Sequence, residues 1–278
     1  MNKSISKLYN INVLRIIGII ILLFIVYSNS AFAETQDTIQ IDSNMSAEDI
    51  INNIDDEGKK QMILKFFEPI YVYFDNDNSI AHGDSEKIYN RLKTLASMSK
   101  EELNDEMKKQ LYKLIEETKD SKNDGYFSSE GVAIIKEILP DKLNSIVTAE
   151  EFFYKKQFDF LEKSSTHNST KDSIVREYKK QNTVGYTSLE GKAYCLTVYI
   201  EWKTKSGKIV SKKSSYSTWT NTLWSVEGVK KITDTIDSRG FGNIVYKGRF
   251  KHNVGLPVIK TIRNEAWFYG DGGCDWSY

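Results

Sequence analysis

Histidine and cysteine are scarce in this chain of 278 residues, which has only three histidines and two cysteines. With three imidazoles, at most one or two can serve any single site, and none lies in a recognised catalytic arrangement. Nucleophile elbows, HExxH zinc motifs, phosphate-binding glycine loops and paired CxxC motifs are also absent. The sequence therefore favours a protein that is not an enzyme, although an enzyme that relies on two carboxylates remains open.

The two cysteines allow one intramolecular disulfide, between Cys195 and Cys274. In an exported chain such a bridge is favoured, and it would join the first long predicted strand to the carboxyl end. The closed loop has about 80 residues, for which the chain-entropy model gives a stabilisation of about 4 to 5 kcal/mol. The alternative is that both thiols are free or form intermolecular bonds.

The amino end has the three parts of a secretory signal. Basic residues precede an uncharged apolar run, Ile16 to Tyr27, and small residues follow at Ala31 and Ala33. This run is shorter than the roughly 20 apolar residues that span a bilayer, so a cleaved signal peptide is favoured over a membrane anchor. We therefore predict a secreted, extracellular protein, with association with the cell surface as an option. The excess of lysine over arginine is typical of AT-rich genomes and favours a Gram-positive bacterium.

A net charge of zero hides a strong division along the chain. Residues 34–163 contain 28 acidic and 17 basic side chains (net −11), whereas residues 164–278 contain 10 and 18 (net +8) and all five tryptophans. Such a difference in charge and aromatic content predicts two domains. The predicted segments are a signal peptide (1–33), a flexible mature amino terminus (34–44), an acidic helical domain (45–163), a linker with a short helix at 171–181 (164–183) and a basic β domain (184–278).

Apolar spacing predicts the fold class, which is α+β. Ser99 and Glu102 form a capping box before a helical pattern over 99–118, and Pro140 ends another helix. The segment 57–74 is also helical in pattern, but Pro69 interrupts it, and Ile70 to Phe74 can instead be a short extended piece. After Gly185 the period changes to two, with strands expected near 194–202, 209–219, 229–236, 244–251 and 258–269. We therefore expect a small helical bundle followed by an antiparallel, sandwich-like β domain.

One acidic loop suggests a metal site. Asp75, Asp77, Ser79 and Glu86 match ligand positions 1, 3, 5 and 12 of an EF-hand calcium loop, but Ile80 replaces the glycine of its sharp turn. The alternative is an ordinary helix-connecting turn, because such turns have the same composition. The segment 70–77 also resembles the first motif of the haloacid dehalogenase phosphatases, which implies a nucleophilic Asp75 and an acid/base Asp77. No alternation of strands and helices follows, as that family requires.

The strand expected at 244–251 has a cationic face, because apolar residues alternate there with basic ones. These basic residues, with others that follow and one tryptophan, form the candidate ligand-binding set: Lys247, Arg249, Lys251, Lys260, Arg263 and Trp267. An anionic wall polymer, an acidic glycan or an anionic membrane fits such a surface. The alternatives are a plain solvated face or internal docking on the acidic helical domain. Four aromatic side chains can either form a platform on which sugar rings stack or belong to the core. These are Trp219, Trp224, Trp267 and Tyr269.

These observations favour a secreted, non-enzymatic binding protein whose β domain contacts an anionic or glycan ligand at the cell surface. The alternatives are a secreted hydrolase that uses acidic or metal-bound residues near Asp75 and Asp77, and a membrane-active toxin. No nucleic-acid partner is expected. No cofactor is expected either, except calcium at the loop that begins with Asp75.

Overall fold

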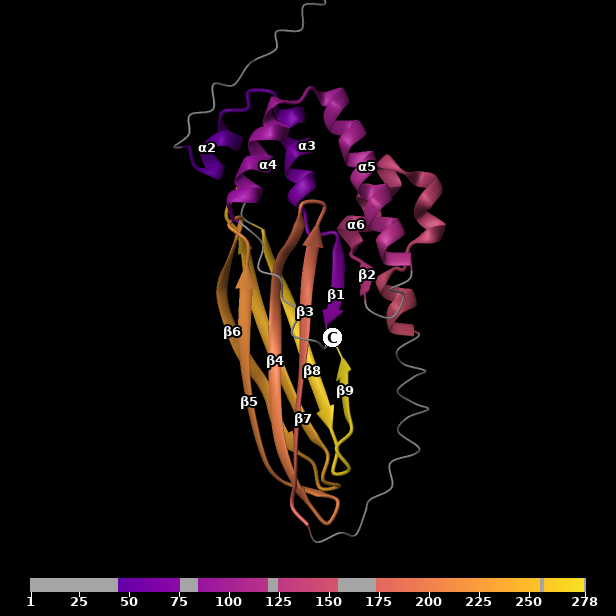
Figure 1. The fold of residues 1–278 in the computed structure, drawn as a ribbon, viewed down its shortest axis with the longest axis vertical. Coiled ribbons are helices and arrows are strands. Elements are labelled where there is room, and N and C mark those ends of the chain that lie inside the picture. Colours follow the sequence, from indigo (N-terminus) through magenta and orange to yellow (C-terminus); the bar gives the residue numbers. More distant parts are fainter. Residues whose placement is uncertain (1–44, 76–84, 120–124, 155–173, 256–257, 278) are drawn as a thin grey trace, which may run out of the picture. The chain divides into compact units, whose positions relative to one another are not determined.

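The computed structural model describes residues 45–75, 85–119, 125–154, 174–255 and 258–277, which all belong to one compact unit, Ile39–Tyr278. These residues form a mixed α+β structure with helices and two antiparallel sheets, as the sequence predicts (Figure 1). The predicted signal peptide 1–33 and the segment 34–44 lie outside the described residues. None of the described helices is long and apolar enough to cross a membrane.

Side chains cap the free backbone amides at the start of several helices, among them α2, α3 and α6. The predicted capping box is confirmed, because the Glu102 amide donates to the Ser99 hydroxyl at 3.2 Å and the Ser99 amide donates to the Glu102 carboxylate at 2.7 Å. Pro140 follows the end of a helix, as expected. Residues 149–154 are helical, and the other helices are α2 (Ala47–Asn52), α3 (Glu57–Phe67), α4 (Ser85–Ser97), α5 (Lys100–Lys119), α6 (Ser129–Ile138) and the 3-10 helix η1 (Pro140–Ser145).

The first sheet has the strand order β2-β1-β3-β4-β5. Its long strands are β3 (Arg176–Ser188), β4 (Gly191–Lys205) and β5 (Lys208–Thr220), joined by short hairpin turns. The short strands β1 (Tyr71–Asp75) and β2 (Gly125–Phe127) come from the part of the chain that is otherwise helical. The extended alternative for the segment after Pro69 is thus confirmed, and β1 pairs with β3 through Asp75 opposite Thr183.

The second sheet has the strand order β6-β7-β8-β9. Its strands are β6 (Trp224–Ile236), β7 (Gly242–His252), β8 (Ile259–Phe268) and β9 (Cys274–Ser277). All neighbours are antiparallel, and β7 and β8 lie in the middle of the sheet. The strands predicted near 229–236, 244–251 and 258–269 are therefore confirmed.

The short helix predicted over 171–181 is wrong for the part that the structure describes, because residues 176–181 belong to β3. This part of β3 is largely exposed and has charged residues in succession, so it lacks the alternation of apolar residues that marks a strand. Its pairing partner decides its structure: every residue from Arg176 to Gln181 is opposite a residue of β4.

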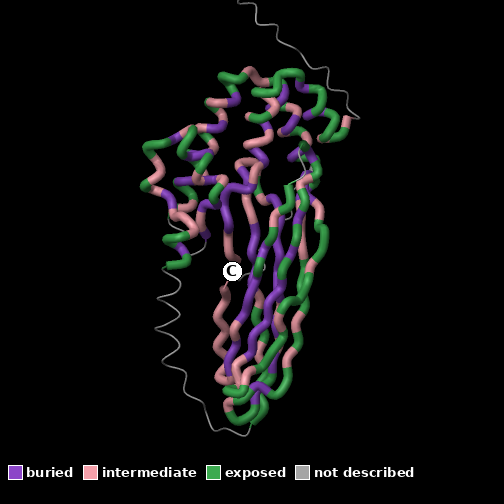
Figure 2. The backbone as a smooth tube through the Cα atoms, turned by 180° about the vertical axis from the view of Figure 1, so that it is seen from behind, coloured by how far each residue is buried: buried purple, intermediate pink, exposed green. Residues whose placement is uncertain are grey.

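The two sheets pack face to face around a buried core. The rings of Tyr194 and Phe250 stack with centroids 4.7 Å apart, and those of Trp202 and Phe268 lie 5.2 Å apart. The Trp202 indole donates to the Tyr269 carbonyl at 3.0 Å. Figure 2 shows that buried segments run along the strands and continue into the helices. One cluster of buried side chains includes both sheets and the helices, so described residues on either side of 155–173 share a core.

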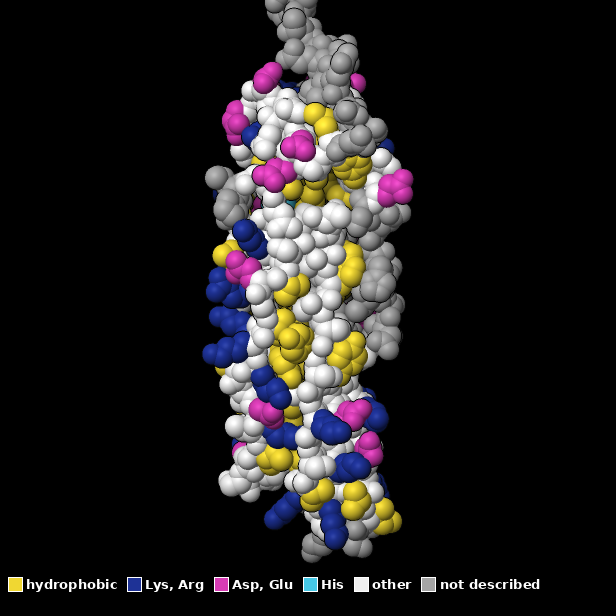
Figure 3. Space-filling view, turned by 90° about the vertical axis from the view of Figure 1, so that its left-hand side faces the viewer, with side chains coloured by type: hydrophobic (Ala, Val, Ile, Leu, Met, Phe, Trp, Pro, Cys, Tyr) yellow, Lys and Arg dark blue, Asp and Glu magenta, His cyan; other side chains and the backbone are white. Residues whose placement is uncertain are grey.

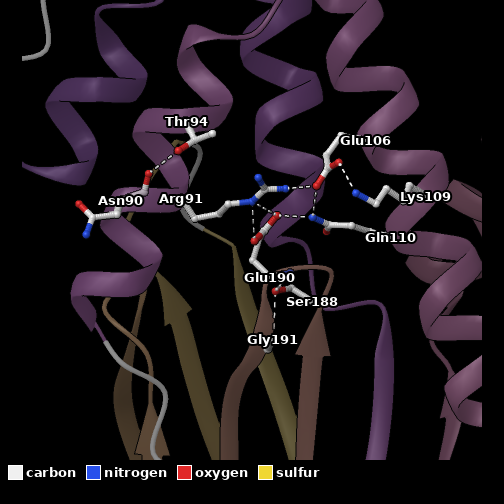
Figure 4. A network of polar contacts seen from close by, with 9 residues as sticks. All are labelled: Asn90, Arg91, Thr94, Glu106, Lys109, Gln110, Ser188, Glu190 and Gly191. Atoms are coloured by element: carbon white, nitrogen blue, oxygen red, sulfur yellow. Dashed lines mark hydrogen bonds and ion pairs between the residues drawn. The ribbon is translucent and has the colours of Figure 1, made fainter.

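A polar network joins the helices to the hairpin between β3 and β4 (Figure 4). Glu190, in the hairpin turn, accepts from the Arg91 Nε of α4 at 3.0 Å. The same guanidinium contacts Glu106 of α5 at 2.5 Å, and the Gln110 amide of α5 donates to Glu106 at 3.0 Å and to Glu190 at 3.1 Å. The side chains of Arg91 and Glu190 are only 23% and 10% exposed. Arg91 therefore holds two largely buried carboxylates from different elements together.

The predicted disulfide is wrong, because Cys195 and Cys274 are both free thiols. Cys195 lies on β4 in the first sheet, and Cys274 lies on β9 in the second. Side chains alternate along β4, so Cys195 points away from the face on which Leu196 packs against the second sheet, whereas Cys274 packs against the shared core. Burial raises the pKa of both thiols, that of Cys274 to about 12.

We expect a reducing agent to leave the thermal stability of the purified mature protein unchanged. A bridge closing this loop would contribute about 4 to 5 kcal/mol, and its reduction would lower the melting temperature by many degrees. Differential scanning fluorimetry with and without reductant measures this. Alkylation of the denatured, unreduced chain is expected to modify both Cys195 and Cys274. A protein with no reactive thiol before reduction would contradict the structure.

Candidate functional site

The cationic strand has the alternation that the sequence predicts. In β7 the side chains of Ile244, Tyr246 and Phe250 are buried, and those of Lys247 and Arg249 are exposed. Lys251 is also exposed on the same side. Because β7 is a central strand, its exposed side chains lie in the middle of the outer face of the second sheet. Figure 3 shows Lys and Arg side chains in a column along its left-hand edge.

Neighbouring strands extend this positive charge across the sheet. Lys247 is directly opposite Lys230 of β6 on one side and Arg263 of β8 on the other. Strands lie about 4.8 Å apart, so these three cations form a close row. Like charges that oppose each other across strands destabilise a sheet by up to about 1 kcal/mol per pair. We call Lys230, Lys247, Arg249, Lys251 and Arg263 the cationic face.

Two members of the cationic face have carboxylate partners. Arg249 contacts Glu227 at 3.0 Å, and Arg263 contacts Glu265 at 2.7 Å. Burial opposes the ionisation of Glu265, but hydrogen bonds from Arg263, Asn243 and Ser277 outweigh it and lower its pKa.

Among the described residues, no carboxylate lies within ion-pairing distance of the remaining three lysines, Lys230, Lys247 and Lys251. A shallow groove of about 330 Å³ runs over the face, lined by Glu227, Gly228, Val229, Lys230, Ile232, Lys247 and Arg249. An anion placed in this groove can contact several cations at once.

Lys260 is not part of the cationic face. Its register partner is the buried Phe250, so its side chain lies on the opposite side of β8 from Arg263. It contacts Glu130 of α6 at 2.5 Å and Glu68, which follows α3, at 3.7 Å. Lys260 therefore joins the second sheet to the helices, which is the internal docking that the sequence left as an alternative.

The aromatic residues do not form one platform. Trp267 lies on the same side of β8 as Arg263, half-buried, but four residues further along the strand. Trp224 and Tyr269 are buried, and Trp219 lies on β5 in the other sheet. Only Trp267 therefore accompanies the cationic face.

The predicted metal site falls mostly outside the described residues, which include neither Asp77 nor Ser79. Asp75 ends β1, and Glu86 lies in the first turn of α4. Within the described ranges, no three His, Cys, Asp or Glu side chains are grouped so that they can hold a metal ion.

No family model, curated protein or solved structure matches this chain.

Lys230 is the member of the cationic face that sequence reasoning missed. The strand 229–236 was predicted, and Lys230 is visible in it, but its place opposite Lys247 depends on the register between β6 and β7. Two bulges, near Glu227 and Ile232, shift that register, and no local pattern reveals them.

Proposed function

We propose that this protein is an exported, non-enzymatic binding protein whose cationic face binds an anionic polymer at the cell surface. In this proposal the two sheets act as a sandwich-like binding domain, and the acidic helical bundle acts as a spacer or partner site. The observation that supports it most directly is the row Lys230–Lys247–Arg263, in which like charges oppose each other and two of the three have no carboxylate partner among the described residues.

The spacing of the cations favours a repeating ligand over a single ion. Cations repeat about every 4.8 Å across the strands and about every 6.8 Å along β7, where Lys247, Arg249 and Lys251 are two residues apart. The phosphate or carboxylate groups of a flexible polymer can follow such a grid, and each contact relieves repulsion within the row. The groove is shallow, which suits an extended chain lying across the sheet.

Removal of the three unpaired lysines is expected to weaken polyanion binding about 100-fold at low ionic strength. Each lysine near an anionic surface contributes about 1 kcal/mol, so the triple variant K230A/K247A/K251A loses about 3 kcal/mol. The measurement is retention of the full mature chain on immobilised polyphosphate, with uncharged dextran beads as a blank. Retention of the unmodified protein is expected to fall as salt is added, because surface charges are screened.

A charge-matched variant separates a defined face from the effect of net charge alone. K203A/K208A/K213A removes three lysines from the first sheet, and we expect it to bind polyphosphate within a few-fold of the unmodified protein. Equal losses in the two triple variants would show that the cationic face has no special role. Absence of retention of the unmodified protein at low salt would refute the proposal outright.

A further inference from the structure

A second recess lies on the other side of β9 from the cationic face. It has a volume of about 560 Å³, within the range of small-ligand sites, and it is lined by Lys179, Lys180, Gln181, Tyr199, Ile200, Glu201, Cys274 and Trp276. These residues come from β3 and β4 of the first sheet and from β9 of the second. The recess begins beyond the end of β1, whose last residue, Asp75, is opposite Thr183 of β3. We call it the β9 groove.

The residues that line the β9 groove include two aromatic rings and several hydrogen-bonding groups. Trp276 and Tyr199 are both half-buried, so each ring keeps an accessible part. The Tyr199 hydroxyl lies 3.2 Å from the Ser217 hydroxyl, which fixes its direction. The lining also includes an amide, a carboxylate and ammonium groups, and thus both donors and acceptors. Sugars need this combination, because their ring faces are apolar and their hydroxyls both donate and accept.

The charges of the β9 groove leave one cation in excess. Lys179 contacts Glu201 at 3.0 Å and Glu177 at 3.9 Å, so this lysine is compensated. Lys180 is exposed, and no carboxylate of the described residues lies within ion-pairing distance of it. A ligand that places one negative charge beside Lys180 gains an ion pair that the protein itself does not supply.

We propose that the β9 groove binds an acidic saccharide, with a sugar ring against the Trp276 indole and a sugar carboxylate beside Lys180. This site is separate from the cationic face, since Trp276 and Cys274 pack toward the first sheet whereas Lys247 and Arg263 point outward from the second. A protein with both sites holds an anionic polymer and a glycan at once. Tetragalacturonate also suits the cationic face, so the two sites are separated by testing the β9 groove in the K230A/K247A/K251A background as well.

Calorimetric titration of the full mature chain with tetragalacturonate, and with the neutral cellotetraose, tests the proposal. The unmodified protein is expected to bind tetragalacturonate at least tenfold more tightly than cellotetraose. Lys180→Met is expected to weaken tetragalacturonate binding about tenfold and to leave cellotetraose binding unchanged, because only the carboxylate contact is lost. Trp276→Ala is expected to weaken the binding of both saccharides at least tenfold, and Trp276→Phe to retain most of it because a ring remains.

Trp267→Ala is the matched control, because Trp267 lies on the opposite side of the same sheet and is also half-buried. It is expected to bind both saccharides as the unmodified protein does. The K230A/K247A/K251A background removes tetragalacturonate binding to the cationic face, and the tenfold effect of Lys180→Met is expected to persist in this background. If Trp276→Ala fails to fold, Lys180→Met and Trp276→Phe still decide the question. No binding of tetragalacturonate by the unmodified protein at millimolar concentration, or equal effects of Trp267→Ala and Trp276→Ala, would overturn the proposal.

Discussion

Arg91→Met is expected to lower the free energy of unfolding by about 3 kcal/mol, because it leaves two carboxylates without their cation. Glu190 and Glu106 both contact this guanidinium, and their side chains are 10% and 21% exposed. Removing one partner of a buried ion pair lowers the free energy of unfolding by about 3 to 5 kcal/mol. Because Arg91 is partly exposed, we expect a value at the lower end of this range. Methionine keeps the apolar stem, so most of the loss is electrostatic.

Urea denaturation followed by circular dichroism measures the effect. Lys65→Met is the control: Lys65 contacts Glu137 at 2.7 Å, but these side chains are 33% and 58% exposed, so its loss is expected to stay below about 1 kcal/mol. Arg91→Met/Glu190→Gln is expected to be more stable than the sum of the single effects predicts, because the second change removes a stranded charge. Equal effects of Arg91→Met and Lys65→Met would contradict the network in Figure 4.

The network also gives the protein a defined response to acid. Burial opposes the ionisation of Glu106, but hydrogen bonds from Gln110 and Arg91 outweigh it, so its pKa is lowered below 4.5. A carboxylate with a lowered folded-state pKa contributes stability above its unfolded pKa, and this contribution is lost as the pH falls through the folded value. The unmodified protein is therefore expected to lose more stability than Arg91→Met between pH 5 and about pH 3.

The helices and most strands were predictable because their signals are local. A capping box at Ser99 and a proline at 140 mark helix ends within a few residues, and alternation over 194–202 marks a strand in the same way. The strand at 176–181 was missed because its residues are exposed and charged, and only their pairing with β4 makes them extended. Nothing in the local sequence contains that information.

The candidate site was predictable in part. The outward direction of Lys247, Arg249 and Lys251 follows from alternation along one strand. The assignment of Lys260 to the same surface as Arg263 was wrong for a reason that the sequence contains: the two are three residues apart in one strand, and an odd separation places their side chains on opposite faces. By contrast, the free state of the two cysteines depends on which sheet each strand joins, and no cysteine count reveals it.

A buried amide pair fastens the two sheets to each other. Asn264 of β8 has no exposed surface; its amide donates to the carbonyls of Asn182 at 3.0 Å and Leu196 at 3.2 Å, and its oxygen accepts from the Asn182 amide at 3.2 Å. The Asn182 side-chain oxygen has no hydrogen-bond partner among the described residues. The side chain of Asn182 therefore depends on the hydrogen bond that its amide donates to Asn264. Polar groups in such a core need their partners, because water cannot replace them.

Asn264→Ala is therefore expected to lower the free energy of unfolding by about 3 to 4 kcal/mol. The change leaves the buried Asn182 amide and two carbonyls without their partner, at about 1 to 3 kcal/mol for each unsatisfied group, and it opens a small cavity between the sheets. Urea denaturation followed by tryptophan fluorescence measures this, because Trp202 lies in the same core. Thr261→Ala, at an exposed position of the same strand, is the control and is expected to change stability by less than about 0.5 kcal/mol.

A double-mutant cycle separates the lost hydrogen bonds from the lost volume. In Asn182→Ala/Asn264→Ala the second substitution removes the amide that the first left unsatisfied, so the combined effect is expected to fall short of the sum of the single effects by about 1 to 2 kcal/mol. If only packed volume joined the sheets here, the two effects would add. Additive effects, or a loss in Asn264→Ala no larger than that in Thr261→Ala, would show that this amide pair does not hold β8 against β3 and β4.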